Sequence, residues 1–307
     1  MAHNNPKYPF IVGLGVCCED RIGLIPAWPS EDDGVHLKEY TRQCGGMVAT
    51  ALAAASKLGI STALLSMAGN DDSGLWLKKE MSRQGVDVSQ FILKSGFPTP
   101  FSIILVNAPD GHRRIFHYRP VEYQLGSGEV NLEIIRHVRF LHLDGHFMDL
   151  AIEAAREAHR RGVKVCLDAW KPYPNMEKLI PLVDYLICNR HFPLIFTGKK
   201  DLNAALGELA RVGPELSAAS LGKDGLLALY HGEFLQIPSS PVQVVDTTGA
   251  GDVLHGAFLA GLCKDKGIQE ALRYACAAAS LSCQSLGGQG ALPTHREVMN
   301  LLVFSEK

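Results

Sequence analysis

The segment with the clearest chemical potential lies between residues 242 and 256. An apolar run over 242–245 predicts a strand, and it leads directly into Asp-Thr-Thr-Gly-Ala-Gly-Asp at 246–252. Gly and Ala let the backbone turn tightly, so several N–H groups can face one spot at a helix N-terminus, where the helix dipole favours an anion. Asp252 falls in the first helical turn. Its carboxylate can take a proton from a hydroxyl while the N–H groups hold a phosphoryl group.

A first-turn Asp often does no more than complement the helix dipole. The glycines around Asp252 favour the catalytic interpretation, because they suit the close approach of a ligand. Other phosphate-binding patterns do not occur: the sequence has no G-x-x-x-x-G-K-[ST], and Gly13-Leu14-Gly15 lacks the third glycine of a dinucleotide fingerprint. An NAD-dependent oxidoreductase is therefore disfavoured.

Polar residues also follow the predicted strand at 140–143. Ligands bind at the carboxyl ends of parallel strands, so we assign His146 to the edge of a substrate pocket. His142, Asp144 and His146 alternate, but they share a face only if the strand continues through all three. We therefore do not predict a metal site there.

The elements that must position these residues alternate between strand and helix. We expect strands at 10–16, 61–67, 140–143, 163–167, 185–188 and 226–230, and helices at 47–58, 73–84, 150–161, 202–211, 251–263 and 269–284. Gly59 is placed to end the first of these helices. This alternation predicts an α/β fold with a mostly parallel sheet between helices.

Two segments break that rhythm, at 19–43 and 95–121. In the second, β-rich runs at 101–106 and 113–118 flank an Asp-Gly turn, which predicts a hairpin. The two segments are either surface hairpins or one small sheet beside the core, which comprises 1–18, 44–94 and 122–307.

Composition excludes several classes of protein. The 307 residues are 47% hydrophobic and 20% charged, which is typical of a globular domain. The net charge of −2 provides no basic excess for nucleic acid. No apolar run is long enough to span a membrane, and residues 1–10 do not resemble a signal peptide. The eight cysteines form no C-x-x-C pair, which favours free buried thiols and a reducing cytoplasm.

The sequence resembles the PfkB (ribokinase-like) family of sugar and nucleoside kinases over essentially its whole length. Residues 246–252, D-T-T-G-A-G-D, are similar to the family's C-terminal signature. Residues 45–50, G-G-M-V-A-T, are similar to its G-G-x-x-x-N pattern, with Thr50 where Asn is usual. Together these features are similar to a sub-branch that includes sulfofructose kinases.

The resemblance implies a Rossmann-like core with a small β-sheet lid formed by the two insertions. It implies transfer of the ATP γ-phosphoryl group to a sugar hydroxyl, with Mg²⁺ on the phosphates. Asp252 would be the general base, and the N–H groups of Gly249, Ala250 and Gly251 would hold the phosphoryl group. The acceptor would contact four residues: Asp20, Gly45, Gly46 and Thr50.

The resemblance also implies a nucleotide site. It would include Asn189, Lys171, Ser220, Gly222, Gly225, Thr247, Thr248 and Cys276. The family pattern N-x-x-E is broken, because Phe192 stands where Glu is usual. Backbone carbonyls of Asp246 and Thr248 would hold a monovalent cation such as K⁺.

The sequence leaves alternatives open. A nucleoside kinase and a non-catalytic sugar or nucleotide sensor remain on the same fold, although the presence of Asp252 opposes the sensor. We expect a small-molecule sugar and ATP as ligands, no nucleic-acid or membrane partner, a cytoplasmic location and a homodimer that pairs through the lid.

Overall fold

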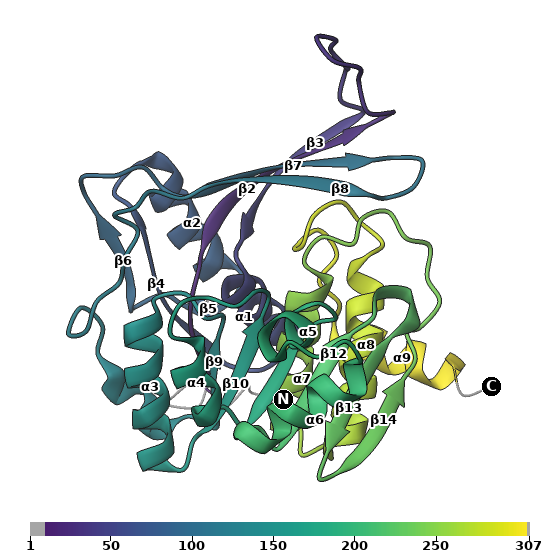
Figure 1. The fold of residues 1–307 in the computed structure, drawn as a ribbon. Coiled ribbons are helices and arrows are strands. Elements are labelled where there is room, and N and C mark those ends of the chain that lie inside the picture. The colour runs from purple at the N-terminus through teal and green to yellow at the C-terminus, as the bar shows by residue number, and fades with distance from the viewer. Residues whose placement is uncertain (1–9, 306–307) are drawn as a thin grey trace.

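The computed structural model describes residues 10–305, so the interpretation that no signal peptide is present concerns residues that lie partly outside the described part. The main sheet consists of β1 (Ile11–Leu14), β4 (Thr62–Gly69), β5 (Val86–Asp87), β6 (Phe91–Lys94), β9 (Phe140–Leu143), β10 (Lys164–Ala169), β11 (Tyr185–Asn189), β12 (Leu216–Ser220), β13 (Leu226–Tyr230) and β14 (Glu233–Ile237). Their order is β14-β13-β12-β11-β10-β9-β1-β4-β5, with β6 beside β4 (Figure 1). All pairs are parallel except β12 with β13 and β13 with β14. The predicted mostly parallel sheet is confirmed.

Helices cover both faces of this sheet (Figure 1). One layer contains α1 (Met47–Lys57), α2 (Asp72–Arg83), α7 (Ala250–Cys263), α8 (Ile268–Ser282) and α9 (His295–Ser305), and the other contains α3 (Met148–Arg161), α4 (Met176–Leu179), α5 (Phe192–Thr197) and α6 (Leu202–Val212). Each layer closes its own apolar core against the sheet. The 3₁₀ turns are η1 (Leu132–His137), η2 (Ile180–Leu182) and η3 (Gly222–Asp224). None of the helices in the described chain is long and apolar enough to cross a membrane.

Local chemistry explains where helices begin, end and pack. Asp71 caps α2 by accepting a 2.8 Å hydrogen bond from the Gly74 N–H. Gly59, at φ +89°, ends α1 as predicted. Within α7, a Cβ on Gly256 would lie 2.1 Å from the Ala51 carbonyl oxygen of α1. Only glycine allows α1 and α7 to pack this closely.

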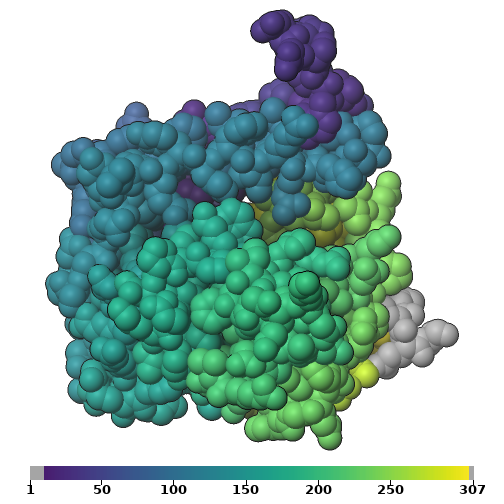
Figure 2. Space-filling view, viewed as in Figure 1, coloured from purple at the N-terminus to yellow at the C-terminus, as the bar shows by residue number. Residues whose placement is uncertain are grey.

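The two insertions form one separate sheet, hereafter the lid. Its strands are β2 (Cys18–Ile25), β3 (Glu39–Gly45), β7 (Phe101–Asn107) and β8 (Arg113–Tyr118), in the order β3-β2-β7-β8. β2 and β7, one from each insertion, pair in parallel, and β7 and β8 form the predicted antiparallel hairpin. Figure 1 shows the lid extending across one end of the core, and Figure 2 shows it as a layer over that end. The lid alternative is therefore confirmed.

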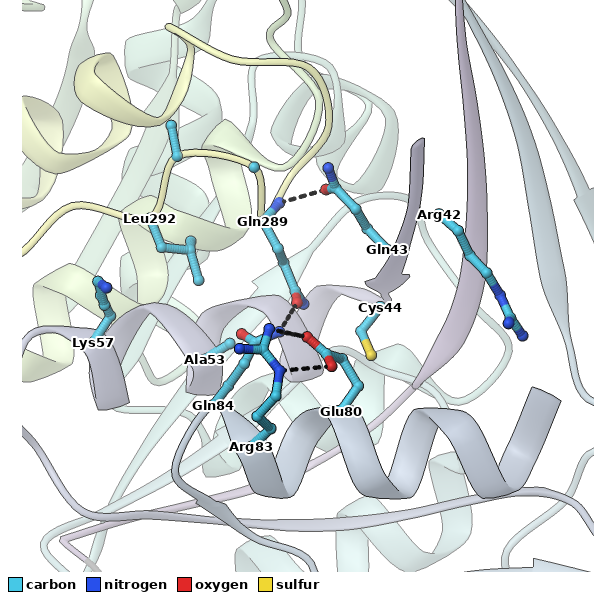
Figure 3. A pocket seen from close by; sticks show the side chains of 12 residues that line it. Arg42, Gln43, Cys44, Ala53, Lys57, Glu80, Arg83, Gln84, Gln289 and Leu292 are labelled. Carbon is cyan, nitrogen blue, oxygen red and sulfur yellow. Dashed lines mark hydrogen bonds and ion pairs between the residues drawn. The ribbon is translucent and has the colours of Figure 1, made fainter. Parts of the chain in front are cut away.

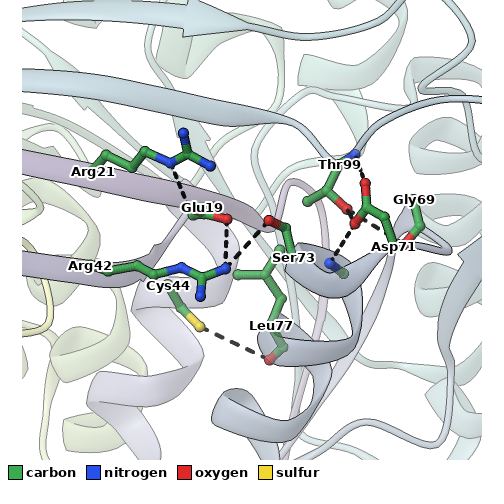
Figure 4. A network of polar contacts seen from close by, with 10 residues as sticks. Glu19, Arg21, Arg42, Cys44, Gly69, Asp71, Ser73, Leu77 and Thr99 are labelled. Atoms are coloured by element: carbon green, nitrogen blue, oxygen red, sulfur yellow. Dashed lines mark hydrogen bonds and ion pairs between the residues drawn. The ribbon is translucent and has the colours of Figure 1, made fainter.

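A polar network fixes the base of the lid to α2 (Figure 4). The Glu19 carboxylate accepts hydrogen bonds from Arg21 at 2.6 Å and from Arg42 at 2.8 Å. Arg42 also donates to the Ser73 hydroxyl at 3.3 Å. The Glu19 side chain is only 2% exposed, so these contacts compensate the burial of a charge.

The structure corrects one predicted strand. Residues 242–245 are not a strand, although they are apolar. The N–H groups of Val245 and Asp246 donate to the Cys283 carbonyl instead of to a neighbouring strand. Val244 is 52% exposed, so this segment is not buried as a sheet strand would be. It leads as an extended surface segment into residues 246–252, hereafter called the phosphate loop.

Candidate active site

A cavity of about 530 Å³ lies between the lid and the carboxyl ends of the central strands. Eleven of the residues predicted from the sequence line it: Asp20, Gly46, His146, Lys171, Asn189, Ser220, Thr247, Thr248, Gly249, Gly251 and Asp252. The remaining predicted residues lie outside its lining: Gly45, Thr50, Gly222, Gly225, Asp246, Ala250 and Cys276. The fold thus gathers residues from both insertions, from β10, β11 and β12, and from the segments that follow β1 and β9 around one space.

The phosphate loop is shaped by Asp246 and Gly249. Asp246 is fully buried, and its carboxylate accepts hydrogen bonds from the Thr248 N–H at 2.9 Å, the Thr248 hydroxyl at 2.8 Å and the Gly287 N–H at 2.8 Å. Gly249 caps α7 at φ 73°, and a Cβ there would lie 2.5 Å from Gly288. The three hydrogen bonds require the carboxylate of Asp246, and the positive φ and the close approach to Gly288 require glycine at position 249. They open the N-terminus of α7 to the cavity, where an anion is favoured.

Asp252 lies in the first turn of α7 and faces the cavity. Burial, followed by the neighbouring carboxylate of Asp168 and that of Asp20, raises the pKa of Asp252 well above its ordinary value. The guanidinium of Arg113 acts in the opposite direction. A raised pKa makes the ionised carboxylate a stronger base, which suits proton transfer from a hydroxyl.

Asp20 stands in β2, lines the same cavity and is 9% exposed. Burial raises its pKa to about 6, although hydrogen bonds from Ser102 and Cys18 oppose the shift. A Cβ on Gly45 would lie 2.0 Å from an Asp20 carboxylate oxygen, and one on Gly46 would lie 2.2 Å from the Val16 carbonyl oxygen. The two glycines therefore give Asp20 its place beside α1, whatever else they contact.

Thr50 is directed away from this cavity. Its hydroxyl accepts a 3.2 Å hydrogen bond from Gln289, which also contacts Gln84 at 2.7 Å and, through its N–H, Gln43 at 3.0 Å. This glutamine cluster lies beside a second cavity of about 490 Å³ between α1, α2 and the 289–292 segment (Figure 3). Contact of Thr50 with an acceptor stays a prediction from the sequence.

His146 lies at the edge of the cavity and is held from two sides. Its Nδ1 is 3.1 Å from the Asp144 carboxylate, and its Nε2 is 3.0 Å from the Tyr173 hydroxyl. Asp144, fully buried, also accepts a 2.8 Å hydrogen bond from the Val16 N–H. Burial opposes its ionisation, but His146 and these N–H groups hold the pKa of Asp144 below its ordinary value. The pair joins the ends of β1 and β9 at the cavity wall.

The lid contacts the phosphate loop through Arg113. Its Nη1 donates a 2.6 Å hydrogen bond to the Thr247 hydroxyl, across 134 residues of sequence. Arg113, Ile115 and His117 alternate along β8 and all line the cavity, whereas Arg114 and Phe116 do not. One face of the lid thus closes the cavity and carries a cation to the phosphate loop.

Asn189 and Ser220 are the last residues of β11 and β12, on the side predicted for the nucleotide. The Asn189 side-chain oxygen accepts from the N–H groups of His191 at 2.9 Å and Phe192 at 3.0 Å, so it also caps the turn into α5. Phe192 is fully buried and packs on Phe196. Phe192, which stands where the family pattern has Glu, is therefore part of the apolar core and offers no polar group to the cavity.

The other predicted nucleotide residues differ in position. Lys171 lines the cavity, with its ammonium 5.0 Å from the Trp170 ring centre. Gly222 and Gly225 form the turn between β12 and β13, where a Cβ on Gly225 would lie 2.0 Å from the Ile237 carbonyl oxygen. Cys276 is 5% exposed within the core of α8. Their contact with a nucleotide stays a prediction.

Sequence reasoning missed several cavity residues, above all Arg113 and Asp168. Asp168 is the last residue but one of β10, and its carboxylate lies 3.4 Å from His255 Nε2. Its position at the carboxyl end of a predicted strand was a usable signal. The cavity-facing side chains of β8 could have been identified from their alternation, but not their contact with a loop 134 residues away.

An α/β core, a helix N-terminus suited to an anion with an adjacent acid, and a lid over the cavity are features of a phosphotransferase that acts on a hydroxyl. The description "pfkB family carbohydrate kinase" matches residues 10–295, so the chain belongs to that family. The eight cysteines are free, as expected.

Known relatives agree with this placement. A ribokinase of Haemophilus influenzae is 27% identical over 305 residues, covering 94% of this chain and 97% of that protein. A nucleoside kinase of Methanothermobacter thermautotrophicus is 22% identical over 294 residues, covering 94% of each. The structure of Arabidopsis thaliana ribokinase complexed with ribose and ATP superposes with a TM-score of 0.77 at 26% identity, covering 96% of this chain and 99% of that one. The protein is thus an ATP-dependent carbohydrate or nucleoside kinase.

Proposed function

We propose that the protein transfers the γ-phosphoryl group of ATP to a hydroxyl of a small sugar, with Asp252 as the general base. The observation that carries this proposal is the position of Asp252, directly beside the N-terminus of α7 and within the lidded cavity. The N–H groups of Gly249, Ala250 and Gly251 are the proposed anion site.

In the proposed step, Asp252 accepts the proton of the acceptor hydroxyl. The hydroxyl oxygen bonds to the γ-phosphorus while the bond to the β,γ-bridging oxygen breaks, which yields ADP and the phosphorylated acceptor. Positioning and charge stabilisation supply most of the rate in this type of reaction. The α7 N-terminus stabilises the equatorial oxygens, and lid closure excludes water from the transfer.

Mg²⁺ would neutralise charge on the ATP phosphates. The carboxylates of Asp168 and Asp252 line the cavity and offer the oxygen ligands that Mg²⁺ prefers. Asn189 already uses its oxygen at α5, and Phe192 offers none. We therefore propose that Mg²⁺ arrives chiefly held by ATP. A K⁺ at the carbonyls of Asp246 and Thr248 remains part of the proposal.

Asp20 is proposed to bind acceptor hydroxyls, with Gly46 beside it and His146 at the cavity edge. Basic side chains line the same cavity: Arg113, His117, Arg119, His146 and Lys171. Such a lining favours an acceptor that carries an acidic substituent over an uncharged nucleoside.

The nucleoside alternative is supported by the similarity to a nucleoside kinase, and by Trp170 and Tyr173 in the cavity lining, which could stack on a base. An acceptor panel separates the alternatives. ADP release would be measured with Mg-ATP against ketoses, aldoses, sugar acids, sulfosugars, phosphosugars and nucleosides. We expect turnover with a sugar, and faster turnover with an acidic sugar than with its neutral parent. Turnover confined to nucleosides would contradict the sugar assignment.

We also propose that two copies pair through their lids. The face of the lid directed away from the cavity exposes several apolar side chains, with Tyr40 57%, Ile103 43%, Phe116 57% and Tyr118 46% exposed, beside Arg21 and Arg114. A four-stranded sheet with such a face and open edges is suited to association with a second copy.

A further inference from the structure

Three side chains with metal-binding atoms meet in the core beneath the phosphate loop. His142 on β9 and Cys166 on β10 are directly opposite in the strand register, and His255 reaches them from α7. His142 and Cys166 are fully buried, and His255 is 2% exposed. One ligand atom from each lies within 4.8 Å of the others, and Cys166 Sγ is 3.7 Å from His255 Nδ1. Among residues 10–305, this is the only group of three His, Cys, Asp or Glu side chains whose ligand atoms lie this close together.

His142 is the residue that ordinary core packing leaves unexplained. Neither of its ring nitrogens has a hydrogen-bond partner, although the side chain is entirely shielded from solvent. Buried polar atoms almost always have a partner, and an exception often marks a missing water or ion. A neutral imidazole keeps a lone pair on one ring nitrogen. That lone pair is available to a cation.

His255 is oriented as a metal ligand usually is. The Asp168 carboxylate lies 3.4 Å from its Nε2, and its Nδ1 lies 3.7 Å from Cys166 Sγ. In the tautomer with the proton on Nε2, the lone pair of Nδ1 faces Cys166. Imidazole ligands of metals typically donate their other N–H to a carboxylate in this way. His255 and Asp168 also line the active-site cavity, which provides a route from solvent.

We propose that His142, Cys166 and His255 form a binding site for Zn²⁺. Two imidazoles and one thiolate are ligands that Zn²⁺ takes in proteins, whereas Mg²⁺ prefers oxygen. Bond lengths of about 2.0–2.3 Å place tetrahedral donor atoms roughly 3.4–3.6 Å apart. The 3.7 Å contact between Cys166 Sγ and His255 Nδ1 is close to that spacing, and the three ligand atoms as a group lie within 4.8 Å, so binding would draw them closer together. Burial raises the pKa of the Cys166 thiol well above its ordinary value. Binding therefore forms a Zn–S bond and releases the thiol proton to solvent, with no redox change.

A bound Zn²⁺ would join α7 to β9 and β10 one helical turn after Asp252. It would stabilise the catalytic helix without touching the substrates. The site does not depend on the proposed kinase reaction, and its test does not use turnover.

The first experiment uses Co²⁺ as a spectroscopic substitute in the metal-stripped full-length protein. We expect one bound equivalent, with a thiolate-to-cobalt charge-transfer band and intense tetrahedral ligand-field bands. This readout needs no variant, so it stands even if a core substitution prevents folding. Binding of Co²⁺ without a thiolate band would overturn the proposal, as would failure to bind one equivalent.

The second experiment measures Zn²⁺ affinity by competition with a chromogenic chelator. Cys166→Ser and His142→Phe should each weaken binding at least ~100-fold and remove the Zn²⁺-dependent rise in Tm. Cys188→Ser is the matched control, because Cys188 is also buried in a central strand but its Sγ bonds to the Ala218 carbonyl at 3.1 Å. Circular dichroism would verify folding. Equal affinity in wild type and Cys166→Ser would show that Zn²⁺ binds elsewhere, and would refute the site.

Discussion

Three carboxylates, Asp20, Asp168 and Asp252, share one cavity. Burial is the main cause of the raised pKa of Asp252, and the carboxylates of Asp168 and Asp20 add to it. Burial is also the main cause of the raised pKa of Asp20. Holding acids in this state is unfavourable for folding and useful for chemistry, because it produces a stronger base and a strong acceptor of hydroxyl hydrogen bonds.

Asp20→Asn should separate the effect of the Asp20 charge on folding stability from its effect on acceptor binding. Burial raises the pKa of Asp20 from its ordinary value of 3.8 to about 6, so its ionised form destabilises the fold increasingly above about pH 4 and fully above pH 6. Asn removes that charge. We expect the variant to be more stable at pH 7.5, by on the order of 2–3 kcal/mol, with the gain vanishing as the pH falls to about 4. KM for the acceptor should rise.

Denaturant unfolding at pH 7.5 and 4.5 measures the difference. Asp224→Asn, at an exposed carboxylate in the η3 turn, is the control and should change little at either pH. A stability gain of equal size at both pH values would contradict the charge-burial explanation.

At the residue scale, the sequence predicts a contiguous motif far better than a composite one. Residues 246–252 determine much of the conformation of their own loop, through the hydrogen bonds that Asp246 accepts from Thr248 and through the positive φ of Gly249. Their position at the cavity therefore follows from local chemistry. Arg113 and Asp168 reach the same cavity from distant elements. Their convergence depends on strand order, which no local pattern contains. Thr50 is directed toward Gln289 for the same reason.

At the scale of elements, the lid and the phosphate loop are coupled through one side chain. The Arg113–Thr247 hydrogen bond is the 2.6 Å contact between β8 and the loop that begins α7. A lid that closes by this contact both holds the acceptor and excludes water.

Arg113→Ala should therefore impair closure. We expect KM for the acceptor to rise about tenfold, and acceptor-independent ATP hydrolysis to increase relative to transfer. Both rates follow from ADP release with and without the acceptor. Arg114→Ala is the matched control, because Arg114 lies on the same strand but outside the cavity, against the Trp28 ring at 4.3 Å. Equal acceptor KM and equal ATP hydrolysis in the two variants would contradict the role of Arg113 in lid closure.

Element prediction succeeded where pattern and burial agree, and failed where they do not. The glycine-ended helix α1 and the Asp-Gly hairpin of β7 and β8 carry strong local signals. Strand β12, Leu216–Ser220, was missed because its Ser and Ala residues show no β preference, yet it lies buried between β11 and β13. Conversely, 242–245 has a strand composition without a strand partner.

At the scale of the whole molecule, the outer face of the lid, with its exposed apolar side chains, is the surface proposed to contact a second copy. Ile103 on β7 is opposite Phe116 on β8, so the two exposed side chains form one patch. Phe116→Asp should convert the proposed dimer to monomer, as measured by light scattering after gel filtration. Ile195→Asp, at a 65% exposed residue of α5, is the control and should leave the dimer intact. A wild-type protein that is monomeric throughout the micromolar range would contradict lid pairing.

The most direct test of the account is the effect of Asp252→Asn on phosphoryl transfer to the best acceptor found in the panel. The variant keeps the size of the side chain but removes the base. We predict that kcat falls by roughly 10²–10⁴-fold or more, while the affinity for Mg-ATP, measured by calorimetry, stays near that of wild type. Turnover close to the wild-type rate in a folded, ATP-binding variant would contradict the role of Asp252 as the general base.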